Sequence, residues 1–148
     1  MSALSVTQVA SLNVSRIKDI DSTRLGALTS KQIQALTTGQ INALMPNQVS
    51  SMSVENMSVL TTEQIASLQS AGIGALTSAQ MQALSTDQLD AMTSAQIQAL
   101  RSDVLTNMSS EQVSSLSTDH IVALTQPQFE AFTPEQVTWF TSDQFPAI

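Results

Sequence analysis

TSAQMQAL at residues 77–84 and TSAQIQAL at residues 93–100 differ at one position, and the eight residues between them keep the same spacing. Cut after Leu4, the rest of the chain divides without insertion or deletion into 18 such octads, from residues 5–12 to residues 141–148. A short fixed period is the signature of a repeat architecture, in which each unit packs only on its neighbours. We therefore predict that residues 1–148 form a single octad-repeat domain.

The positions of the octad differ sharply in the residues that they accept. The fifth and the eighth are apolar in every copy, the first is Ser, Thr, Asn or Asp in 15 of 18 copies, and the fourth is Gln in 12. The seventh is mostly small, with Ala in ten copies and Ser in four.

This pattern predicts a new helix start in every octad. Ser or Thr at an N-cap with Gln three residues later is a capping box, and the apolar residues before the cap and at N4 form a hydrophobic staple. Pro46, Pro127 and Pro134 fall in the first turn of such helices, where a missing N–H costs nothing.

Two other folds fit the octad poorly. In one continuous helix the apolar stripe would rotate by about 80° per octad, so no single partner could bury it. A β-solenoid is disfavoured because positions five, seven and eight do not alternate with period two. We predict an all-α solenoid, a superhelix of very short helices, one per octad, with positions five and eight facing inward. Three octads per turn would give a compact triangular coil.

The two ends of the chain depart from the octad pattern. Residues 5–28 are irregular N-terminal repeats in which charged residues gather, and we expect them to form a solvated cap or a head-to-tail contact with the acidic remainder. The last repeats, 125–148, are aromatic and are predicted to cap the solenoid or to contact a partner or the next subunit. The candidate cap or interface residues there are Phe129, Phe132, Trp139, Phe140 and Phe145.

Composition excludes several classes of protein. Twelve acidic against five basic residues give a net charge of −7, which excludes a nucleic-acid partner, because phosphate binding needs a basic face. Without cysteine there is no disulfide, no thiolate metal site and no thiol nucleophile. No apolar stretch approaches about 18 residues, so we expect no membrane insertion. The start MSALSVTQVASL lacks the features of a secretory signal, yet the Ser/Thr/Gln-rich composition is typical of an extracellular or cell-surface protein.

A search for chemistry finds no site. His120 is the only histidine, it stands at position four, and we interpret it as a capping-box substitute, because one imidazole falls short of the ligands that zinc needs. Gly72 and Gly74 lack the third glycine and the strand of a phosphate loop, and the acidic residues at position three lack the spacing of a calcium loop. No Gly-x-Ser-x-Gly elbow supports a catalytic triad. We predict no catalytic, cofactor-binding or metal-binding residue, and no enzyme.

Over residues 5–148 the octad Ala-Leu-Thr-Ser/Thr-x-Gln-Ile-x resembles the Ala-Leu-Thr-Thr-x-Gln-type repeats of bacterial adhesin-like surface proteins and of inserts in flagellin-type proteins. The resemblance implies a spacer or display surface and brings no catalytic residues. We therefore expect a non-enzymatic structural or interaction protein, acting as a spacer, an adhesive module or a filament subunit that assembles with itself end to end. The alternative is a binding module whose regular Ser/Thr-rich face recognises a peptide, a glycan or a repetitive lattice such as ice.

Overall fold

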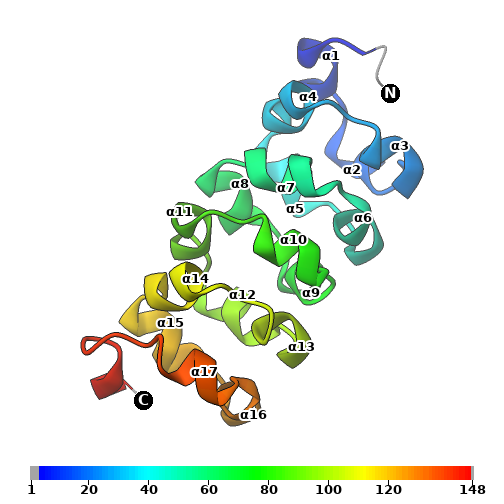
Figure 1. The fold of residues 1–148 in the computed structure, drawn as a ribbon. Coiled ribbons are helices and arrows are strands. Elements are labelled where there is room, and N and C mark those ends of the chain that lie inside the picture. Colours follow the sequence, from blue (N-terminus) through cyan, green and yellow to red (C-terminus); the bar gives the residue numbers. More distant parts are fainter. Residues whose placement is uncertain (1–3, 148) are drawn as a thin grey trace.

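The computed structural model describes residues 4–147, and within this range the chain is a coil of short helices (Figure 1). It holds 17 α-helices of four to six residues, one closing 3₁₀ helix and no strand in these residues. The predicted all-α solenoid with one short helix per octad is thereby confirmed, except that the last octad forms the 3₁₀ helix; its eighth residue, Ile148, lies outside the described range.

The helices are α1 (Val6–Ala10), α2 (Val14–Ile17), α3 (Ser22–Gly26), α4 (Ser30–Ala35), α5 (Thr38–Asn42), α6 (Pro46–Ser51), α7 (Val54–Val59), α8 (Thr62–Ser67), α9 (Ser70–Gly74), α10 (Ser78–Gln82), α11 (Thr86–Asp90), α12 (Ser94–Ala99), α13 (Ser102–Leu105), α14 (Ser110–Ser115), α15 (Thr118–Ala123), α16 (Gln126–Ala131), α17 (Pro134–Val137) and η1 (Phe145–Ala147).

Each α-helix begins at position two of its octad, and in all but three of them, α6, α9 and α13, the side chain at position one caps it. In α8, the Thr61 hydroxyl accepts a hydrogen bond from the Gln64 backbone N–H at 3.1 Å, and the Gln64 side-chain oxygen accepts one from the Thr61 N–H at 3.0 Å. These two bonds are the predicted capping box, and it recurs along the chain.

The chain changes direction between helices without glycine. Where a helix runs to position seven, position eight and the following position one are both extended, as at Leu36 (φ −62°, ψ 132°) and Thr37 (φ −71°, ψ 160°). No residue in the described range has a positive φ. Two extended residues therefore redirect the chain, and the next cap starts a new helix at a new angle.

The core is a continuous apolar column inside the coil. From Val9 to Val113 the side chains at position five are at most 1% exposed, and from Leu28 to Leu116 those at position eight are at most 4% exposed. Both positions face inward, as predicted.

Helices three apart in the chain pack against one another, as in the series α3, α6, α9, α12 and α15. Side-chain hydrogen bonds from position four run instead to the octad four places earlier, as described next. A superhelical turn therefore takes between three and four octads, slightly more than the triangular coil would need.

The turns are joined by the glutamine at position four. The Nε2 group of Gln96 donates hydrogen bonds to the carbonyl oxygens of Ile65 and Leu68, both at 2.8 Å, while its Oε1 accepts from the N–H of Thr93. Gln96 is 1% exposed. We call this set of bonds, from position four to the carbonyls of positions five and eight four octads earlier, the glutamine ladder. Its full members are Gln40, Gln48, Gln64, Gln80, Gln88, Gln96, Gln112, Gln128, Gln136 and Gln144.

The ladder predicts that glutamate cannot replace these glutamines, although it can complete a capping box. We expect Gln96→Glu to lower the free energy of unfolding by about 2–3 kcal/mol, because the buried Leu68 carbonyl loses its donor and a charge is brought against it and against the Ile65 carbonyl, which still accepts the Leu68 N–H. Urea and thermal unfolding followed by circular dichroism measure this.

Gln8 provides the matched control. It is exposed and caps the Ser5 N–H at 2.8 Å, but no octad lies four places before it. Gln8→Glu should change stability by less than about 0.5 kcal/mol. Equal losses in the two variants would mean that the glutamines matter only as caps.

Candidate functional site

The glutamine ladder is interrupted at octad 101–108, and a neighbouring side chain repairs the gap. Val104 occupies position four there, so the carbonyl of Leu76 receives no glutamine. Arg101, at the cap position, donates from Nη2 to that carbonyl at 3.3 Å and also pairs with Asp103 at 3.2 Å. The two departures from the octad pattern are thus coupled, and the arginine acts as a substitute for the missing glutamine.

His120 occupies position four of its octad, in α15. Like a glutamine of the ladder, it both caps its own helix and contacts a carbonyl of the earlier turn, using one ring nitrogen for each contact. Nδ1 lies 3.4 Å from the backbone N of Ser117, and Nε2 lies 2.8 Å from the carbonyl oxygen of Met92. The neutral tautomer with its proton on Nε2 satisfies both contacts. The predicted capping role of His120 is confirmed. Within residues 4–147, moreover, no three His, Cys, Asp or Glu side chains come together as metal ligands.

Residues 5–28 form the N-terminal end face of the described coil, and two of their position-four residues are arginines. Arg16 and Arg24 stand at position four, with 77% and 70% of their side chains exposed. They form surface ion pairs with Asp19 at 3.7 Å and with Asp21 at 3.1 Å. Such exposed pairs contribute little to stability. In these octads position four is therefore an exposed, charged side chain and not a buried amide.

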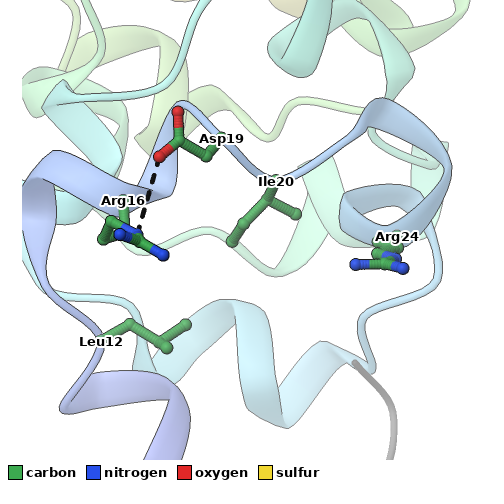
Figure 2. A pocket seen from close by; sticks show the side chains of 5 residues that line it. All are labelled: Leu12, Arg16, Asp19, Ile20 and Arg24. Carbon is green, nitrogen blue, oxygen red and sulfur yellow. Dashed lines mark ion pairs between the residues drawn. The ribbon is translucent and has the colours of Figure 1, made fainter.

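A hollow of about 190 Å³ opens on this end face. It is lined by Leu12, Arg16, Asp19, Ile20 and Arg24, and Figure 2 shows the two arginines on either side of Ile20. Leu12 and Ile20 are position-eight residues, yet they are only half-buried, unlike their buried counterparts in the interior. Leu12 and Ile20 thus form an apolar surface in the hollow. In the interior of the solenoid, the preceding turn covers the residues at this position.

The C-terminal end face is open at the other inward position. Among the position-five residues there, Phe129 is half-buried, Val137 is 37% exposed and Phe145 is 51% exposed. The position-eight residues Phe132 and Phe140 are buried, and Leu124 before them is half-buried. Position five is thus covered by the following turn and position eight by the preceding one, and each end of the solenoid leaves one of them open.

The five predicted aromatic residues fall into two groups. Phe129, Phe132 and Phe140 form one cluster, with ring centroids 5.3 to 6.3 Å apart and largely edge-on contacts. Trp139 is half-buried against the core, whereas Phe145 is 51% exposed in η1. The cluster fits the predicted cap and Phe145 fits the predicted contact surface, and both interpretations stay predictions.

The Ser/Thr-rich face was the other candidate surface. Its position-one side chains, from Ser5 to Thr133, accept hydrogen bonds from the backbone N–H groups of their own helices wherever they are Ser, Thr, Asn or Asp. This row of polar groups is therefore engaged in capping before any ligand arrives.

Sequence reasoning treated position four as a cap and missed the bonds that link one turn to the next. Each of these bonds joins residues 28 or 31 apart, so no local pattern reports it. The signal that could have revealed it is that no copy has Glu or Asp at position four, although either could accept the cap N–H.

These features define the class of protein: an α-solenoid of eight-residue repeats held together by buried amides. The profile of the ALTTAQ repeat family matches residues 17–54 and 65–102, which together make up just over half of the chain. The chain belongs to the ALTTAQ repeat family. No curated protein matches it. In the part of the chain that the structure describes, no helix is long and apolar enough to cross a membrane.

The coupling of Arg101 and Val104 can be tested by restoring the octad pattern. Arg101→Ala alone should lower the free energy of unfolding by about 1–2 kcal/mol, because the Leu76 carbonyl loses its donor. The double variant R101T/V104Q regains both the cap and the ladder bonds, so its midpoint of thermal unfolding should exceed that of the parent chain. Purely additive effects of Arg101→Thr and Val104→Gln in a double-mutant cycle would contradict the coupling.

The two groups of aromatic residues predict opposite responses to truncation. Phe140→Ala should cost about 3 kcal/mol or more, because it removes a buried ring from a packed cluster. Phe145→Ala should leave thermal stability nearly unchanged, because half of that side chain already meets solvent. If both variants lose stability equally, Phe145 belongs to the cap.

Proposed function

We propose that this chain is a non-enzymatic structural module that serves as a rigid spacer. The glutamine ladder carries this proposal: every turn for which it is complete is tied to the next by buried hydrogen bonds. The core beside it is continuous along the whole coil. Bending or stretching the coil would break these buried hydrogen bonds and leave their donors and acceptors without partners, because water does not reach them. The contacts therefore favour a fixed length.

The buried polar side chains support a structural role over a catalytic one. All of them stand at position four, from Gln32 to Gln144, and include Asn56 and His120. In the described part of the chain, none of the buried side-chain nitrogen or oxygen atoms lacks a hydrogen-bond partner. An enzyme site needs polar groups that converge on a pocket and are free to bond a substrate. These groups are instead hydrogen-bonded to the backbone.

The surface supports an extracellular or cell-surface location in a bacterial adhesin-like protein. Its exposed positions one to three are mainly Ser, Thr and acidic residues, and the net charge of −7 opposes adsorption to other acidic polymers. A spacer of this kind would keep the protein segments at its two ends a fixed distance apart.

A change of length tests the proposal. Duplicating residues 77–100 adds three complete octads in register, and the chain offers no cysteine of its own, so Thr38→Cys and Ser110→Cys provide two exposed label sites that flank the insertion. Spin-label distance measurements should give one narrow distribution in the parent chain. The distribution should stay narrow and move to a longer distance in the extended chain.

Labels at Thr38 and Thr62, both on the same side of the insertion, provide the control and should keep their distance. A broad distribution between Thr38 and Ser110, or one that the added octads do not lengthen, would rule out a rigid spacer.

A further inference from the structure

The open surfaces at the two ends of the solenoid are the two halves of an interior contact. Between interior turns, position five of one octad is covered by the following turn and position eight by the preceding turn. The C-terminal end face leaves position five open at Val137 and Phe145, and the N-terminal end face leaves position eight open at Leu12 and Ile20. The two ends lie at opposite ends of the coil (Figure 1), so one molecule cannot bring them together.

The glutamine ladder is divided in the same way. The last position-eight carbonyl that it reaches is that of Leu116, bonded by Gln144, and the carbonyls of Leu124, Phe132 and Phe140 lie beyond it in the described structure. At the N-terminal end face the position-four side chains are the exposed donors Arg16 and Arg24.

An arginine can form such a bond between turns, as the chain itself demonstrates. Within the solenoid, the Nη2 of Arg101 donates to the position-eight carbonyl of Leu76, where a glutamine is missing. The guanidinium groups of Arg16 and Arg24 can donate in the same way. The acceptors at the other end of the coil are again position-eight carbonyls.

Charge favours the same pairing. Four of the five basic residues fall in the second to fourth octads, namely Arg16, Lys18, Arg24 and Lys31, whereas no Lys or Arg follows Arg101. The stretch after Arg101 contains only acidic charges, at Asp103, Glu111, Asp119, Glu130, Glu135 and Asp143. Opposite charge at the two ends steers head-to-tail contact and opposes head-to-head contact.

We propose that the N-terminal end face binds the C-terminal end face of a second copy of this chain, so that the superhelix continues from one molecule into the next. Phe145 enters the hollow between Leu12 and Ile20, and Arg16 and Arg24 donate to the open position-eight carbonyls. The hollow of about 190 Å³ is large enough for a phenyl ring, since a cavity of about 150 Å³ holds benzene. The contact is heterologous and extends into a filament if it does not close.

This inference goes beyond the spacer, which needs no partner, and it can fail while the distances within one chain stay fixed. Sedimentation velocity and light scattering of residues 1–148 over a concentration series should give a mass that rises from 15.8 kDa in steps of one chain. The association should weaken with salt, because the two ends carry opposite charge.

Two variants each remove one end. R16E/R24E reverses the charge of the N-terminal end face, and Phe145→Asp places a charge in the apolar contact; both alter exposed side chains, so circular dichroism should match the parent chain. Each variant alone should remain at 15.8 kDa. Mixed in equal amounts they should form a dimer and nothing larger, because each supplies the end that the other lacks.

Val54 provides the control, because it is 48% exposed in α7, away from both end faces. Val54→Glu should leave association unchanged. R16Q/R24Q should still associate but with less dependence on salt, since glutamine makes this bond at every complete rung of the ladder. A parent chain that stays at 15.8 kDa, association that survives both end variants, or a mixture that forms no dimer would overturn the proposal.

Discussion

The hydrogen bond from the Nε2 of a buried glutamine to a backbone carbonyl of the preceding turn is the interaction on which this solenoid depends. An α-helix leaves its last four carbonyls without partners inside the helix, and helices of four to six residues consist almost entirely of such ends. Packed into a core, those carbonyls would each destabilise the fold by about 1–3 kcal/mol. The ladder supplies the donor for the position-eight carbonyl and a second donor for the position-five carbonyl, which already accepts the N–H of position eight. One-turn helices thereby become compatible with a buried interior.

The same side chain also fixes the geometry of the coil. Its Oε1 is held by the cap of its own helix while its Nε2 bonds to the octad four places earlier, as in Gln88, which is linked to Ser85 and to Leu60. One rigid amide therefore sets the distance from a helix start to the turn before it. A single inserted residue would move position four away from its carbonyls and every later rung with it, which accounts for an array of 18 octads without one insertion or deletion.

The sequence predicted the features that arise within one octad. Caps, first-turn prolines and the apolar positions five and eight act over three or four residues, so their pattern is visible in each copy. The size of the superhelical turn and the burial of position four arise between octads, at separations of 28 and 31 residues, and the period of eight does not report them. The only trace is chemical: a cap needs an acceptor at position four, whereas the ladder also needs a donor, and glutamine supplies both. Histidine at position 120 meets the same pair of requirements with two ring nitrogens.

Copies without glutamine indicate how the solenoid tolerates a missing rung. Arg16 and Arg24 are exposed and pair with Asp19 and Asp21, and Arg101 replaces the donor that Val104 lacks. Gly72 is a different case: a Cβ built there would lie 3.1 Å from Val49 Cγ2, so the neighbouring turn has closed over the space of the absent side chain. Packing and hydrogen bonding are thus alternative ways to join one turn to the next. Because each joint is local, a defect in one octad weakens that joint alone and the coil continues past it.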